Sequence, residues 1–133
     1  MSITDDEVRQ RNMAAIHAFF DADERRVMAD WIRFWHPEGR QTFFLSFDNP
    51  PVVGRDELIR IFQRKFDIRP HYGIEVVTEP FLDPNKVFVR LLLTHGEGIR
   101  PTDIWNVFTF DDQGLILLWE ELVDTAHSFK FPQ

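Results

Sequence analysis

Two glutamates interrupt an apolar segment near the end of the sequence. Residues 115–123 read Leu-Ile-Leu-Leu-Trp-Glu-Glu-Leu-Val, which predicts a β-strand. Because side chains alternate between the faces of a strand, Glu121 shares a face with Trp119 and Glu120 lies on the other, unless a β-bulge exchanges them. A carboxyl among apolar side chains loses hydration, which raises its pKa toward the range of a general acid or base. The alternative is an ordinary ion pair with an arginine, for which the candidates are Arg90 and Arg100.

Two further titratable residues, His95 and Asp103, lie in or beside predicted strands. His95 could carry a proton or donate to a developing oxyanion, although the following Gly96-Glu97-Gly98 is equally consistent with a solvated ring in a loop. Asp103 shares a strand face with Trp105, and an aspartic acid kept protonated in an apolar pocket can donate to an enolate oxygen. A solvated aspartate near a strand start is the simpler interpretation. The predicted catalytic residues are therefore Glu121, His95 and Asp103.

Aromatic residues are abundant, with 14 phenylalanines and 4 tryptophans in 133 residues. Part of this surplus could line a pocket for a flat or apolar ligand. A bulky core together with a dimer interface explains it equally well. The candidates for pocket walls are Trp35, Phe62, Tyr72, Trp105 and Trp119.

Composition limits the function classes. The formal net charge of −7 argues against nucleic-acid binding, which needs clustered Lys and Arg. The absence of cysteine excludes disulfides, a thiolate nucleophile and a cysteine-based zinc site. The N-terminal residues are acidic and lack an apolar stretch, and no apolar run approaches the ~20 residues of a membrane span. We therefore expect a cytoplasmic protein that binds neither nucleic acid nor membrane.

The elements that would position these residues follow from periodicity and turn signals. Three helices are predicted at about residues 4–23, 25–35 and 55–66, the first opened by a capping box at Thr4 and Glu7. His36-Pro37-Glu38-Gly39 is expected to end the second helix. Strands are predicted at residues 41–47, 72–81, 86–95, 102–111 and 115–123. Helices followed by a run of antiparallel strands define the α+β class, in one domain over residues 1–133. Both faces of the strands are apolar, so we expect helices on one face and a second copy of the chain on the other, in a homodimer.

Several short motifs carry a family resemblance. They are Val53-Gly54-Arg55-Asp56-Glu57-Leu58, Asp83-Pro84-Asn85-Lys86-Val87-Phe88-Val89, His95-Gly96 and Asp112-Gln113-Gly114-Leu115-Ile116. With the order of elements, they resemble the nuclear-transport-factor-2-like superfamily, which includes ketosteroid isomerases and SnoaL-like polyketide cyclases. The closer likeness is to the phenazine-biosynthesis A/B family, in which a glutamate matches Glu121.

The resemblance implies a cystatin-like cone in which three N-terminal helices pack on a curved, mostly antiparallel sheet around a cavity. It also implies proton transfer on a small apolar or aromatic cyclic metabolite, without metal or organic cofactor. The third helix departs from the phenazine pattern, because Ile59-Arg60-Ile61-Phe62-Gln63 contains no histidine. We therefore expect a related cyclisation, isomerisation or dehydration in secondary metabolism. The alternative is a non-catalytic module of the same fold that binds a small molecule or mediates dimerisation.

Overall fold

The computed structural model describes residues 2–43 and 49–123. Within these residues the helices are α1 (Asp5–Arg25), α2 (Met28–Ile32) and α3 (Arg55–Ile68). The strands are β1 (Trp35–Phe43), β2 (Val52–Val53), β3 (Gly73–Pro80), β4 (Lys86–Thr94), β5 (Thr102–Phe110) and β6 (Ile116–Val123). They form one six-stranded sheet in the order β2-β1-β6-β5-β4-β3, in which β1 and β6 are parallel and every other pair is antiparallel.

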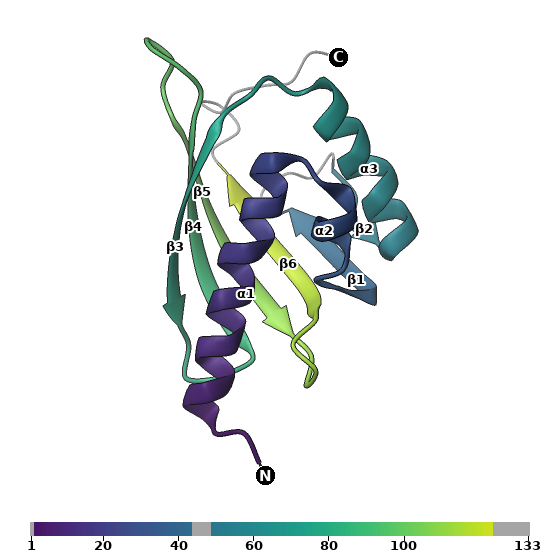
Figure 1. Cartoon of the computed structure of the whole chain (residues 1–133), viewed down its shortest axis with the longest axis vertical. Helices are drawn as coiled ribbons and strands as arrows, with labels where there is room; N and C mark the ends of the chain where they lie inside the picture. Colours follow the sequence, from purple (N-terminus) through teal and green to yellow (C-terminus); the bar gives the residue numbers. More distant parts are fainter. Residues whose placement is uncertain (1, 44–48, 124–133) are drawn as a thin grey trace.

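The helices cover one face of the sheet, which we call the inner face. Helix α1 crosses β3 and β4, while α3 packs on β1 and β2 and α2 lies between the two longer helices (Figure 1). This arrangement confirms the predicted α+β class, with three N-terminal helices on a mostly antiparallel sheet. No helix in the described residues is long and apolar enough to cross a membrane.

The predicted start of the first helix is confirmed at atomic detail. The Thr4 hydroxyl accepts a hydrogen bond from the Glu7 backbone amide at 3.2 Å, and the Glu7 carboxylate accepts one from the Thr4 amide at 3.4 Å. The reciprocal pair satisfies two amides that the first helical turn leaves without partners. The helix then presents one buried stripe to the sheet, formed by Asn12, Ile16, Phe19, Phe20 and Asp23.

The prediction of a second helix to Trp35, ended by Pro37 and Gly39, is wrong. Helix α2 ends at Ile32, and Trp35 begins strand β1. Pairing with β6 shifts register between Trp35 and Arg40, so Pro37 and Gly39 lie in an irregular stretch of this strand. A Cβ on Gly39 would stand 2.6 Å from a Trp35 ring carbon. The glycine therefore permits the Trp35 ring to fold back over its own strand. The predicted strand at residues 41–47 overlaps β1 at its start, and residues 44–48 lie outside the described residues.

The last strand carries a bulge that the periodicity of the sequence does not reveal. Thr109 pairs with Leu118 and Phe110 pairs with Ile116, so Leu117 is the extra residue. Ile116 is consequently fully buried, whereas strict alternation would place it on the outer face with Leu118. Beyond the bulge the alternation is regular, and Trp119 and Glu121 share the inner face as predicted.

Aromatic side chains fill the space between the helices and the middle of the sheet. Phe19 of α1 contacts Phe108 of β5 and Trp119 of β6, with ring centroids 6.0 and 5.8 Å apart. On the α3 side, Phe62 stacks on Trp31 at 4.4 Å. This packing joins the helices to β5 and β6 through side chains and supports the inner surface on which Glu121 lies.

Candidate active site

Glu121 lies on the inner face beside the parallel pair of strands. Its cross-strand neighbours are Asn106 of β5 and Phe43 of β1. The buried Gln41 side chain donates a hydrogen bond from Nε2 to Glu121 Oε2 at 2.9 Å. Burial raises the pKa of the Glu121 carboxyl, the positive charge of Lys65 and the Gln41 hydrogen bond oppose the shift, and the negative charge of Asp23 adds to it. The carboxyl therefore has the environment of an acid or base that titrates above its ordinary range.

Asn106 is held next to Glu121 by a complete set of hydrogen bonds. Its Oδ1 accepts from Trp119 Nε1 at 2.7 Å, and its Nδ2 donates to the Val89 carbonyl at 3.0 Å. Buried amides need such partners, and here they fix the Trp119 ring beside the carboxyl. Asn106 thus positions the neighbours of Glu121 and leaves the Glu121 oxygens to Gln41.

A lysine from helix α3 lies within electrostatic range of this carboxyl. Lys65 Nζ lies 4.5 Å from the centroid of the Phe62 ring, and the side chain is partly exposed. Burial lowers the pKa of Lys65, and the charges of Glu121 and Asp23 oppose that shift. No carboxylate of the described residues comes within ion-pair distance of Lys65, so the amine is near two acids and bound to neither.

Arg69 and Asp23 form a buried ion pair. Arg69 Nη1 and Asp23 Oδ1 are 2.9 Å apart, and the two side chains are 3% and 6% exposed. Trp31 Nε1 donates to the second Asp23 oxygen at 3.1 Å. Arg69 also donates to the Asp23 carbonyl and to the Tyr72 hydroxyl. We call Asp23, Gln41, Lys65, Arg69 and Glu121 the inner polar cluster.

Four members of the inner polar cluster were missed by sequence reasoning, namely Asp23, Gln41, Lys65 and Arg69. Helical spacing offered a signal for three of them. Lys65 and Arg69 continue the buried stripe of α3 that Leu58 and Phe62 begin, and Asp23 continues that of α1. A charged residue on an otherwise apolar stripe indicates a buried partner. Gln41 offered no comparable signal, because the sequence does not reveal that its strand pairs with the strand of Glu121.

His95 lies elsewhere on the inner face. Its Nε2 is 2.8 Å from the Thr102 hydroxyl, and Thr102 is four residues, or about 13 Å, along β5 from the Asn106 that faces Glu121. Burial lowers the pKa of the His95 ring. The ring meets Tyr72 edge-on at 5.7 Å. The structure therefore groups His95 with Tyr72 and does not place it beside Glu121.

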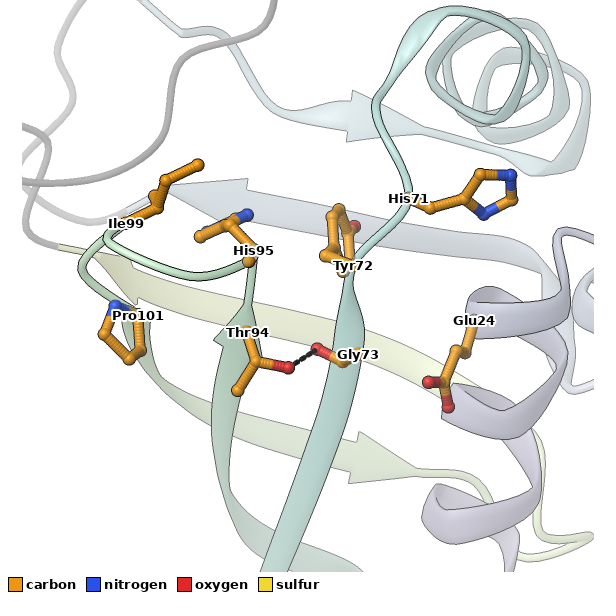
Figure 2. Close-up of a pocket in the computed structure, with 9 residues that line it drawn as sticks. Glu24, His71, Tyr72, Gly73, Thr94, His95, Ile99 and Pro101 are labelled. Carbon is orange, nitrogen blue, oxygen red and sulfur yellow. Dashed lines mark hydrogen bonds between the residues drawn. The ribbon is translucent and has the colours of Figure 1, made fainter.

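His95 and Tyr72 line an open hollow of about 530 Å³ at one end of β3 and β4 (Figure 2). Its lining residues are Glu24, His71, Tyr72, Gly73, Thr94, His95, Gly96, Ile99 and Pro101. Because the Tyr72 hydroxyl accepts from Arg69, this ring connects the hollow to the inner polar cluster. Within residues 2–43 and 49–123, no group of three or more His, Asp or Glu side chains has the arrangement of a metal site.

The prediction that Asp103 is kept protonated in an apolar pocket is wrong. Asp103 is on the outer face, where Arg90 Nη2 and Nε donate to its two oxygens at 2.6 and 3.0 Å. Hydrogen bonding to Arg90 lowers the pKa of this exposed carboxyl. The same contact removes Arg90 as a partner for Glu121. Trp105, also a predicted pocket wall, is 52% exposed on the outer face and does not line the inner one.

The other predicted pocket walls lie on the inner side. Trp35, Phe62 and Trp119 are at most 4% exposed and pack ring against ring, with Trp119 6.3 Å from Trp35 and 5.8 Å from Phe62. They belong to the aromatic core. Two of these side chains lie next to the inner polar cluster. The Phe62 ring lies under the Lys65 amine, and Trp119 is two residues before Glu121 on the same strand face.

Comparison with known proteins identifies the family to which the chain belongs. The model of the SnoaL-like domain matches residues 16–119, and the chain belongs to this family. The predicted superfamily is thereby confirmed, whereas the closer likeness to the phenazine A/B family stays a prediction. Glu121 lies two residues beyond the matched range. No match was found among curated proteins.

Solved structures with the same fold include proteins described as cyclases and isomerases. The epoxide hydrolase/cyclase-like enzyme SalBIII, described in pyran ring formation in the polyether salinomycin, is 14% identical, with a TM-score of 0.75 over 93% of this chain and 97% of its own. A candidate polyketide cyclase from Xanthomonas campestris pv. campestris is 17% identical, with a TM-score of 0.73 over 90% and 94%. A steroid delta-isomerase from Pseudomonas aeruginosa is 19% identical, with a TM-score of 0.65 over 88% and 82%. At these identities the similarity establishes the fold.

Proposed function

We propose that this protein is an acid/base enzyme of isomerase or cyclase type that acts on a small apolar cyclic metabolite of secondary metabolism without a cofactor. Glu121 moves the proton. The observation that carries the proposal is a partly buried glutamate that shares the inner face with Trp119, accepts a hydrogen bond from Gln41 and has its pKa raised by burial. The activities described for proteins of the same fold, cyclisation and steroid isomerisation, are reactions of this class.

The cluster around Glu121 suits a general base that must change its protonation state during turnover. The positive charge of Lys65 influences the carboxyl without an ion pair between the two side chains, and the negative charge of Asp23, which is paired with Arg69, acts on it in the opposite direction. A carboxylate locked to an arginine would lose basicity, whereas one that accepts a single hydrogen bond from an amide keeps three lone-pair sites for substrate and proton. Phe62 and Trp119, which are 3% and 4% exposed, keep the surroundings of the carboxyl apolar.

Direct titration of Glu121 tests the proposal without a known substrate. In a sample labelled with ¹³C at the glutamate side-chain carboxyl, one resonance is expected to titrate above the ordinary glutamate range, because burial disfavours the charged form. That resonance should be absent from Glu121→Gln and present in Glu120→Gln, the neighbour on the opposite face. A Glu121 that titrates at the ordinary value removes the physical basis for proton transfer. Ligand binding with such a value would assign the protein to the binding modules of this fold.

We also propose that the protein is a homodimer that buries the outer face of the sheet. Val77, Trp105 and Leu122 occupy one cross-strand row on this face and are 45%, 52% and 38% exposed. Arg90 lies within the row and is neutralised by Asp103. Several large apolar side chains exposed on one face of a sheet are typical of an interface with a second subunit.

Replacement of Trp105 by Glu is expected to shift the chain toward the monomer. A buried tryptophan at the centre of an interface is commonly worth at least about 2 kcal/mol, or roughly 30-fold in the dissociation constant. Sedimentation velocity over a concentration series measures the shift. Leu82→Glu is the matched control, because Leu82 is 93% exposed at the turn after β3, away from this row. A wild-type chain that stays monomeric at every soluble concentration would rule out this interface.

A further inference from the structure

The hollow at the end of β3 and β4 has no role in the chemistry proposed for Glu121. Its volume of about 530 Å³ falls within the range of about 300–1,000 Å³ that is typical of small-molecule pockets. The His95 ring on its wall contacts Thr102, which lies about 13 Å along β5 from Asn106, the residue that faces Glu121. The hollow is therefore a separate candidate binding site.

One end of the hollow carries a negative charge. Among the described residues that line it, Glu24 is the only acidic one. Its Oε1 accepts a hydrogen bond from the Ile74 backbone amide at 3.3 Å, which holds the carboxylate against the start of β3. In the described part of the chain, no cationic side chain forms an ion pair with Glu24, and Arg69, which donates to the Tyr72 hydroxyl, is neutralised by Asp23. A carboxylate in this setting is complementary to a ligand that carries a cation.

The other end of the hollow is apolar. Ile99 is 48% exposed and comes, with Pro101, from the segment that connects β4 to β5. Figure 2 shows these two side chains on the far side of the hollow from Glu24, with Tyr72 between them. The Tyr72 ring meets the His95 ring edge-on at 5.7 Å. Aromatic surface therefore joins the charged end of the hollow to its apolar end.

Gly73 leaves space in the hollow beside the carboxylate. A Cβ at this position would stand 2.6 Å from Thr94 Oγ1 and 3.8 Å from Glu24 Oε1. A larger residue would therefore displace the Thr94 side chain, whose hydroxyl donates to the Gly73 carbonyl at 3.5 Å. It would also fill the space next to Glu24 that a ligand would need.

We propose that this hollow binds a small primary amine that carries an aromatic or aliphatic ring. The ammonium group contacts the Glu24 carboxylate, and the ring packs on Tyr72, Ile99 and Pro101. An ammonium offers three hydrogen-bond donors to a carboxylate, and the formal net charge of −7 favours the approach of a cation. The inference goes beyond the proposed function, because it concerns a different ligand at a different place. Either can fail while the other stands.

A single NMR signal can report on the hollow, because Tyr72 is the only tyrosine of the chain and can be labelled with ¹³C in its ring. Titration with 2-phenylethylamine at about pH 8, where a primary amine is protonated and imidazole is ordinarily neutral, should shift this signal to saturation. The neutral 2-phenylethanol, of the same shape, should bind about three- to fivefold more weakly, the usual effect of an exposed ion pair. The anion 3-phenylpropionate should bind more weakly still, because Glu24 repels it.

Glu24→Gln tests the role of the charge. The variant keeps the size of the side chain and its acceptor for the Ile74 amide, so the affinity for 2-phenylethylamine should fall to that for 2-phenylethanol, which should not change. Glu79→Gln, at the opposite end of β3, is the matched control and should leave both affinities unchanged. Ile99→Ser should weaken both ligands by the same factor, because it removes apolar surface. No saturable shift of the Tyr72 signal up to the solubility limit of the amine, or equal wild-type affinities for amine and alcohol, would overturn the proposal.

Discussion

Glu121→Gln is expected to lower the turnover number for a confirmed substrate by about 10²–10⁴-fold, the usual contribution of one general acid or base. Glutamine preserves the shape of the side chain and can accept the Gln41 hydrogen bond, which is 2.9 Å long in the wild type. It cannot titrate. The Michaelis constant should change little, because the substitution keeps the shape of the side chain and its apolar surroundings. Steady-state kinetics with Glu120→Gln as the control measure both quantities.

A turnover number in Glu121→Gln equal to that of the wild type would show that Glu121 does not transfer the proton.

The same variant also tests whether the pKa of Glu121 is raised in the folded protein. A carboxyl whose pKa is higher in the folded state than in the unfolded state stabilises the fold fully below its ordinary pKa, and this contribution is lost as the pH rises through the folded value. The free energy of unfolding should therefore fall with rising pH in the wild type over that window, and fall less in Glu121→Gln. Urea unfolding at a series of pH values gives both curves.

Lys65 contributes to the same pH profile with the opposite sign. Burial lowers its pKa in the fold, so its contribution to stability is full above the ordinary lysine value and is lost as the pH falls through the folded value. Lys65→Met should remove that second dependence. Lys65→Met should change the free energy of unfolding by a different amount in the Glu121→Gln background than in the wild type, because the two groups influence each other's charge.

Asp23→Leu is expected to destabilise the protein by about 3–5 kcal/mol, the cost of leaving one member of a buried ion pair without its partner. The substitution removes the acceptor of two contacts, from Arg69 at 2.9 Å and from Trp31 Nε1 at 3.1 Å. It leaves a guanidinium that is 3% exposed without an anion. The expected loss is a large part of the 5–15 kcal/mol by which domains are ordinarily stable. Urea unfolding monitored by tryptophan fluorescence measures it.

The double variant Asp23→Leu, Arg69→Met identifies the cause. Because an apolar pair of similar volume can replace a buried ion pair at little cost, the second substitution should restore much of the lost stability. Glu57→Gln serves as the control, since its partner Arg60 is on the exposed surface, where solvent screens the pair and leaves it little effect on stability. A single-variant loss no larger than that of Glu57→Gln would show that the buried pair does not hold α1 against α3.

Much of the fold could be predicted from short-range patterns. The capping box at Thr4, the buried stripes of α1 and α3, and the alternation that places Trp119 and Glu121 on one face depend on residues within a few positions of each other. Such patterns reflect the 3.6-residue period of a helix and the two-residue period of a strand, which follow from backbone geometry. They failed at residues 35–39, where a proline and a glycine mark an irregular strand and not a helix end.

The composition of the site was decided by tertiary contacts. Gln41 reaches Glu121 because β1 pairs in parallel with β6, 80 residues later in the chain. Lys65 and Asp23 come within electrostatic range of each other because α1 and α3 both pack on the inner face. Asp103 lost its predicted role because Arg90 on the adjacent strand binds it. The residues next to it in the sequence determine which face of a strand or helix a side chain occupies. The pKa of that side chain depends on burial and on nearby charges, and both arise only when the chain packs.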